Sequence, residues 1–214
     1  MRIASVVVVA SLALILGGCA QPHEAPDPTP TLSESATPTP IPTVATKPAL
    51  SDLVVYPGGI DYVKVGVPVE QRDEEVAVVL YNANGCESEP NRIIGWESTY
   101  GLGTFDMVTN ADSTIRGIAV RTDAVHTATG IHIGSTVEDI RAAYGDAATV
   151  TEAQITDLYS VTGPDGVLVF EVATERDFDG GDYGARAGTV LWMLVLAPDS
   201  EPFSIAYGAY GACI

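Results

Sequence analysis

The stretch Gly130-Ile-His-Ile-Gly-Ser-Thr-Val-Glu-Asp-Ile-Arg-Ala-Ala-Tyr-Gly145 carries the clearest helix start and stop signals in this chain. Ser135 is a helix-capping residue type, and Glu138 follows three residues later, as in a capping box. An apolar stripe at helical spacing is formed by Val137, Ile140 and Tyr144. Gly145 then supplies the residue type that ends a helix at positive φ. The stretch therefore predicts a short amphipathic helix that packs on another element.

An earlier stretch matches this one position by position. Val63-Lys-Val-Gly-Val-Pro-Val-Glu70 aligns with Ile131-His-Ile-Gly-Ser-Thr-Val-Glu138 and predicts a first helix over residues 69–81. β-Prone segments follow each predicted helix, at residues 92–98, 104–109 and 113–122, and again at residues 158–161, 167–174 and 189–197. The short turn between residues 104–109 and 113–122 predicts that these two segments form a hairpin.

The repeated order of one helix and one strand meander predicts an α+β fold. Two related helix-plus-antiparallel-meander units, residues 51–129 and 130–214, are expected to form a single two-lobed domain. Two copies of a unit this long do not make a solenoid of short repeats. The composition, 46% hydrophobic and 18% charged, favours a globular domain after residue 50.

The N-terminal residues have the features of an export signal. Arg2 precedes an apolar run over residues 3–16, which is too short for an ordinary membrane span. The run ends in Leu16-Gly-Gly-Cys19, which resembles a bacterial lipobox. This resemblance implies that residues 1–18 are a lipoprotein signal peptide and that Cys19 is lipidated and becomes the N-terminus after cleavage. The alternative is an ordinary secretory signal followed by a chance cysteine.

Residues 19–50 have the composition of a linker. Eight prolines alternate with threonines, without apolar periodicity. Such a segment favours extended conformations and behaves as a disordered but semi-rigid stalk. The Thr-Pro pairs are compatible with glycosylation and equally with an unmodified stalk. The stalk is expected to hold the domain away from the lipid.

Charge and cysteine content restrict the partners and the compartment. The net charge of −18 argues against nucleic acid, because phosphates require Lys and Arg. With Cys19 lipidated, Cys86 and Cys213 remain as a pair in an oxidising compartment, and a disulfide between them is the simplest expectation. Two buried free thiols are the alternative. A disulfide would tie the second unit to the first.

The sequence lacks the common catalytic motifs. It contains no Gly-x-Ser-x-Gly, His-Glu-x-x-His, phosphate loop or Cys-x-x-Cys. His132 alternates with isoleucines in a β-prone run, where a histidine is more often a solvent-facing residue than a catalyst. The chain is therefore expected to be neither an enzyme nor a cofactor-binding protein.

Two groups of residues are candidates for binding. Asp177, Asp179 and Asp182 lie in one Gly-rich loop and could hold calcium, although the loop departs from the EF-hand pattern and a solvated loop is the simpler interpretation. The run of residues 190–197 lacks polar alternation, so both of its faces require cover. The second face is expected to be covered by the other lobe or by another protein. If another protein covers it, the aromatic candidates for its anchors are Trp96, Tyr100, Phe105 and Trp192; core packing is the alternative role.

Two resemblances rest on these motifs. The unit that begins at residues 63–70 and 131–138 resembles the repeat of the β-lactamase-inhibitory protein and of outer-membrane assembly lipoproteins. The order of motifs from Cys86 to Cys213, including Val167-Leu-Val-Phe-Glu171, is similar to that of small exported bacterial proteins without an assigned activity. Eight of the ten basic residues are arginine, which with the Ala/Pro/Thr-rich stalk looks like a GC-rich Gram-positive coding habit. These resemblances imply fold and export.

The sequence thus predicts a lipid-anchored protein on the extracytoplasmic face of a cell membrane, at a Gram-positive surface. Its expected role is that of a non-catalytic binding or envelope-assembly module with a protein partner. The alternative is a proteinaceous inhibitor of a secreted hydrolase, which the architectural resemblance alone implies.

Overall fold

The computed structural model describes residues 46–89, 92–101, 103–176 and 186–206. Strands dominate these ranges, and the described part of the chain holds a single α-helix, α1 (Val137–Tyr144). Two short 3-10 turns, η1 (Leu50–Asp52) and η2 (Gly145–Ala147), accompany it. Within these ranges, no helix has both the length and the apolar character of a membrane span.

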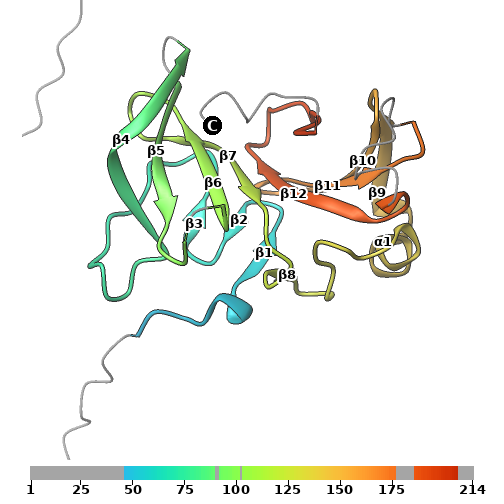
Figure 1. The fold of residues 1–214 in the computed structure, drawn as a ribbon, viewed down its shortest axis with the longest axis horizontal. Coiled ribbons are helices and arrows are strands. Elements are labelled where there is room, and N and C mark those ends of the chain that lie inside the picture. The colour runs from blue at the N-terminus through green and yellow to red at the C-terminus, as the bar shows by residue number, and fades with distance from the viewer. Residues whose placement is uncertain (1–45, 90–91, 102, 177–185, 207–214) are drawn as a thin grey trace, which may run out of the picture. The chain divides into compact units, whose positions relative to one another are not determined.

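One large antiparallel sheet organises the domain (Figure 1). It consists of two four-stranded meanders whose last strands, β7 and β12, pair with each other from Gly117↔Leu196 to Val120↔Met193. Both ends of the sheet are therefore formed by the first strand of a meander. Across the sheet, the strands are β4 (Val79–Glu89), β5 (Arg92–Ser98), β6 (Phe105–Thr109), β7 (Ile115–Val120), β12 (Val190–Leu196), β11 (Gly166–Ala173), β10 (Thr156–Gly163) and β9 (Ala148–Glu152).

The hairpin predicted from residues 104–109 and 113–122 is confirmed. β6 and β7 pair antiparallel, with Phe105 opposite Val120 and Met107 opposite Ile118. In the turn, the backbone N–H of Thr114 donates to Oδ1 of Asp112 at 3.0 Å. This bond stabilises the charged carboxylate and lowers the pKa of Asp112.

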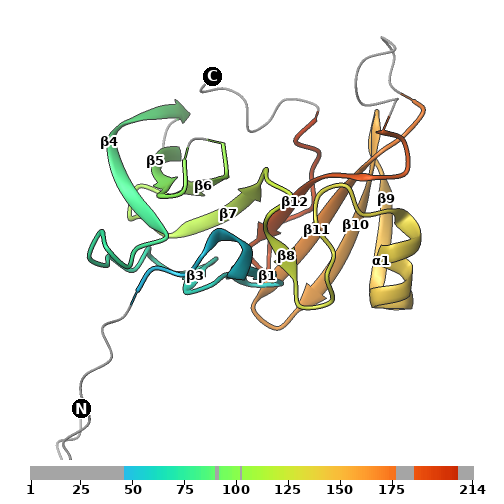
Figure 2. The ribbon, with the colours of Figure 1, turned by 60° about the horizontal axis from the view of Figure 1, so that its bottom comes forward.

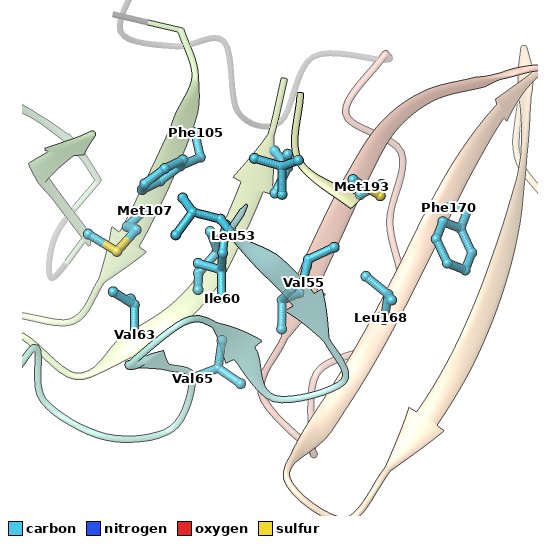
Figure 3. Close-up of a cluster of buried hydrophobic side chains, with 14 of the residues drawn as sticks. Leu53, Val55, Ile60, Val63, Val65, Phe105, Met107, Leu168, Phe170 and Met193 are labelled. Carbon is cyan, nitrogen blue, oxygen red and sulfur yellow. The ribbon is translucent and has the colours of Figure 1, made fainter. Parts of the chain in front are cut away.

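A small sheet covers one face of the large one. Its strands, in spatial order, are β3 (Val63–Lys64), β2 (Gly59–Ile60), β1 (Val54–Tyr56) and β8 (His126–Thr127). Figure 3 shows apolar side chains of this sheet gathered against those of the large sheet. Val55, Ile60 and Val63 are buried together with Leu168, Phe170 and Met193 of β11 and β12. The main core therefore lies between the two sheets.

The two segments with matching sequences dock on the large sheet in the same way. Each forms three backbone hydrogen bonds with residues at or just before the start of the last strand of a meander. The first equivalent pair is Gly66 N–H to Ile115 O (2.7 Å) and Gly134 N–H to Val190 O (2.8 Å). The second is Ile115 N–H to Val67 O (2.9 Å) and Val190 N–H to Ser135 O (2.8 Å). The third is Val69 N–H to Ser113 O (3.1 Å) and Val137 N–H to Gly188 O (3.1 Å). The sequence match thus corresponds to a local structural match.

The helix predicted over residues 69–81 does not form, and the α+β prediction is wrong. After Val69 the chain is irregular, with one turn at residues 74–76, and then enters β4. Pro68 occupies the position equivalent to Thr136, and Gln71 the position equivalent to Asp139, so the first segment lacks both groups that cap α1. The fold is therefore mostly β, with two meanders in one sheet instead of two helix-plus-meander units.

The predicted second helix forms, with its cap one residue later than expected. The N-cap is Thr136, whose Oγ1 accepts the backbone N–H of Asp139 at 3.2 Å, while the Asp139 carboxylate accepts the backbone N–H of Thr136 at 2.8 Å. Ser135 instead accepts the backbone N–H of His132 at 3.1 Å. Gly145 ends the helix at φ 52, as predicted. Figure 2 shows α1 beside β9 and β10.

Replacing Thr136 with Ala should lower the free energy of unfolding by about 1 kcal/mol, because it removes the capping hydroxyl. Urea unfolding monitored by circular dichroism measures this loss. Glu138→Gln is the matched control, since Glu138 is exposed and the observed capping box does not use it. An equal loss in both variants would contradict the observed cap.

The same cap should make stability depend on acid pH. The Thr136 backbone N–H and hydroxyl donate to Asp139 and lower its pKa. A carboxylate with a lowered folded-state pKa contributes stability above its unfolded pKa of about 3.9, and this contribution is lost as pH falls through the lower folded value. We expect unfolding curves from pH 5 to pH 2 to show a smaller loss in Asp139→Asn than in the parent chain.

Candidate functional site

Of the four aromatic residues predicted as partner anchors, Trp96, Tyr100 and Phe105 lie at the main core and Trp192 lies on the other face of the large sheet. Trp96 and Phe105 belong to the main core, with 4% and 1% of their surface exposed. Tyr100 is half-buried and donates its hydroxyl to the carbonyl of Pro48 at 2.8 Å. Trp192 is half-buried on the opposite face of the large sheet. Core packing, the alternative role, therefore describes Trp96 and Phe105, and Tyr100 packs against the same core with its ring centroid 6.4 Å from that of Phe105.

The other predicted site residues fall largely outside the described residues. These are the lipidation site Cys19, the loop carboxylates Asp177, Asp179 and Asp182, and Cys213. Cys86 lies in β4 opposite Ile94, where the structure describes the backbone. The anchor, the disulfide and the calcium site therefore remain predictions. In the described ranges, no three His, Cys, Asp or Glu side chains are grouped as metal ligands.

A shallow hollow of about 450 Å³ opens where α1 begins, and its lining includes His132, Ser135 and Asp139. The polar groups of this hollow already have local partners. The Nδ1 atom of His132 lies 2.8 Å from the carbonyl oxygen of Ile133, and Ser135 and Asp139 hold the turn and the helix cap. The arrangement therefore stabilises the start of the helix and does not place a base beside a nucleophile.

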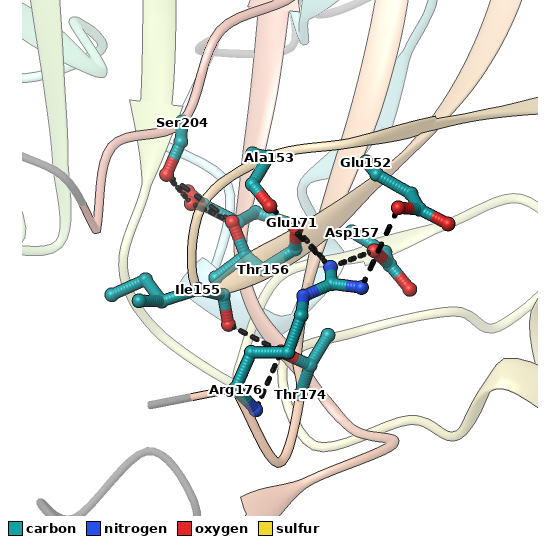
Figure 4. A network of polar contacts seen from close by, with 9 residues as sticks. All are labelled: Glu152, Ala153, Ile155, Thr156, Asp157, Glu171, Thr174, Arg176 and Ser204. Atoms are coloured by element: carbon teal, nitrogen blue, oxygen red, sulfur yellow. Dashed lines mark hydrogen bonds and ion pairs between the residues drawn. The ribbon is translucent and has the colours of Figure 1, made fainter. Parts of the chain in front are cut away.

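A buried carboxylate, that of Glu171 in β11, is the most unusual group of the described domain (Figure 4). Its Oε2 accepts the backbone N–H of Ile205 at 2.8 Å, and its Oε1 accepts that of Ala206 at 3.2 Å. The hydroxyls of Thr156 and Ser204 also donate to Oε1. The sequence carried a signal that went unused: a single Glu in an apolar strand must find hydrogen-bond donors if it is buried.

Arg176, which follows β11, is the centre of a second polar group beside Glu171. Its side chain contacts residues at the turn between β9 and β10. Its guanidinium donates to the Asp157 carboxylate and to the carbonyl of Thr156 at 3.0 Å, and Nη1 lies 3.9 Å from Glu152. Figure 4 shows these contacts converging from neighbouring strands. Because the side chains of Arg176 and Glu152 are well exposed, the ion pair between them contributes little to stability and mainly orders the turn.

The Glu171 cluster holds the segment of residues 201–206 against the second face of the large sheet. Ile205 is buried there in a cluster of apolar side chains, and Phe203 packs against this apolar cluster. The sheet residues of this apolar cluster are Val108, Ala119, Leu158, Val167, Val169, Leu194 and Leu196. The cover that residues 190–197 required on their second face therefore includes the chain's own C-terminal segment, which sequence patterns did not indicate.

The outer edge of β9 is the part of the described domain best suited to contact another chain. β9 pairs with β10 over all five of its residues without a register shift, and no described strand pairs with its other edge. Residues 149–152 are all exposed, and Val150 retains 49% of its surface. An unpaired strand edge presents backbone N–H and C=O groups that can extend a sheet.

Comparisons with protein families, curated proteins and solved structures give no further indication of the site. No protein-family model, curated protein or solved structure matches this chain.

Proposed function

We propose that this chain is a lipid-anchored extracytoplasmic module that binds another protein chain, in a surface or envelope-assembly role and without catalysis. The observation that supports binding is the open edge of β9 at the end of the large sheet. The observations that support the location are Leu16-Gly-Gly-Cys19 at the end of an apolar run and the proline-rich stalk after it. A stalk of this kind holds a binding edge away from the lipid.

Replacing Cys19 with Ser should move the protein from the membrane fraction to the medium. The thioether lipid requires the thiol, and several acyl chains together give stable membrane attachment. Fractionation followed by immunoblotting measures the shift, and incorporation of a labelled fatty acid should be lost in the same variant. Ser35→Ala in the stalk serves as the control. Unchanged membrane retention of Cys19→Ser would contradict the anchor.

Binding through β9 is tested on the full chain in its membrane. A photoreactive residue in place of Val150 should form crosslinks to a protein, while the same residue in place of Val67 should not. The two valines are similarly exposed, at 49% and 46%, and Val67 lies outside β9. Equal crosslinking at both positions would show that β9 is not the binding edge.

A further inference from the structure

The exposed edge of β9 lacks four features that commonly prevent strand addition. Such edges commonly carry Lys, Pro, a β-bulge or an inward-pointing charge. β9 reads Ala148-Thr-Val-Thr-Glu152, pairs regularly with β10, and has one charged residue, at its end. The opposite edge strand, β4, pairs with β5 through two register shifts. Only one of the two ends of the large sheet is therefore regular.

The backbone groups of β9 that face outward follow from the turn before β10. The N–H of Ala153 donates to the carbonyl of Thr156 at 2.9 Å, so these two residues form a hydrogen-bonded pair. Hydrogen-bonded and non-hydrogen-bonded pairs alternate along an antiparallel ladder. Thr151 and Thr149 are consequently bonded to β10, and Val150 and Glu152 direct their N–H and C=O groups outward. By the same alternation the C=O of Ala148 faces outward, while its N–H donates to the carbonyl of Gly145.

We propose that this edge binds the same edge of a second copy of the chain. The sequence Thr149-Val-Thr151 reads the same in both directions. An antiparallel pair centred on Val150 therefore places Val150 opposite Val150 of the partner subunit and each threonine opposite a threonine. Both kinds of pair are favourable neighbours in a sheet. This partner assignment rests on the binding role proposed above and does not require the lipid anchor.

The register centred on Val150 also matches the free backbone groups. The two copies of Val150 exchange two hydrogen bonds, and the N–H of each Glu152 donates to the carbonyl of Ala148 in the other copy. A two-fold axis through the sheet keeps equivalent faces together, so a shift of one residue would oppose side chains from different faces. Larger shifts shorten the paired segment. The centred register is thus the longest one that keeps equivalent faces opposite each other and pairs the outward-facing backbone groups.

The charged residues within β9 itself do not oppose this arrangement. The two Glu152 positions lie at opposite ends of the paired segment, about 14 Å apart along the strands at 3.4 Å per residue. This separation exceeds the Debye length of about 8 Å at physiological ionic strength. The net charge of −18 on each chain acts at longer range. Self-association should therefore strengthen when salt is raised from low to physiological concentration.

The test is sedimentation equilibrium of the full mature chain in detergent, with Val150→Lys, Val150→Glu and Val67→Lys. We expect the parent chain and Val67→Lys to dimerise, and each Val150 variant to have a dissociation constant at least about tenfold higher because like charges face each other. An equimolar mixture of Val150→Lys and Val150→Glu should restore association. Matched circular dichroism spectra and melting temperatures verify that the variants are folded.

Several outcomes would overturn the proposal. They are a monomeric parent chain at all accessible concentrations, a dimer unaffected by Val150→Lys, or a loss that Val67→Lys reproduces. A monomer that nevertheless crosslinks through position 150 to a different membrane protein would overturn the second-copy assignment and leave the proposed binding function intact. A dimer that depends on Val150 but gives no position-specific crosslink in the membrane would support the second-copy assignment and contradict the binding function proposed above.

Discussion

Phe170→Ala is expected to lower the free energy of unfolding by about 4 kcal/mol, because it removes a fully buried aromatic side chain and leaves a cavity. Phe170 has 0% of its surface exposed and points into the core between the large sheet and its cover (Figure 3). Its ring centroid lies 5.5 Å from that of Tyr144 in α1. The substitution therefore removes strand packing and the main aromatic contact of the helix at the same time.

The measurement is equilibrium urea unfolding followed by far-UV circular dichroism and by tyrosine fluorescence. Phe170→Leu is the conservative control and should cost less than about 1.5 kcal/mol, since most of the apolar volume remains. The slope of the transition should be unchanged in both variants. A loss below 1.5 kcal/mol in Phe170→Ala would show that α1 and β11 do not pack as described.

Glu171→Ala is expected to lower the free energy of unfolding by about 3 kcal/mol. Hydrogen bonds to a buried charged group are worth more than neutral ones, and the donors left behind are desolvated. The loss should be local, because the carboxylate joins β11 to residues 204–206. Its removal should free Ile205 and uncover the apolar residues of the second face.

Hydrogen exchange distinguishes this local release from general destabilisation. In Glu171→Ala, the amides of Ile205 and Ala206 should exchange much faster, while those of β6 and β7 should change by less. Binding of a hydrophobic dye should increase as the second face becomes exposed. Glu175→Ala is the control, since Glu175 is exposed at the end of the same strand region. Equal protection of Ile205 in both variants would contradict the role of Glu171.

The features that local sequence patterns predict correctly are short in range. The Gly145 stop, the apolar stripe of α1 and the hairpin of β6 and β7 each depend on residues within one helix or one turn. The duplicated segments at residues 63–69 and 131–137 also make equivalent backbone bonds. Such features are decided by backbone propensity and local capping, which the order of residues states directly.

The first helix failed for a reason visible in the same alignment. The matches at residues 63, 65, 66, 69 and 70 concealed the two positions that matter for initiation, where Pro68 replaces Thr136 and Gln71 replaces Asp139. Helix nucleation is costly, so a short segment without cap groups takes its structure from its neighbours. The backbone bonds of residues 66–69 to Ser113 and Ile115 have equivalents in the second segment, so the missing cap groups are what distinguish the two segments.

By itself, the sequence determined the last three strands of the second meander, the cap region of α1 and the need for cover on both faces of residues 190–197, but it did not indicate β9. Only the tertiary structure decided that β7 and β12 join the meanders into one sheet, that Glu171 holds residues 201–206 over the second face, and that β9 is left with an open edge. These features depend on contacts between residues far apart in the chain. Such contacts are selected by the total burial and hydrogen bonding of the whole fold, which no local pattern encodes.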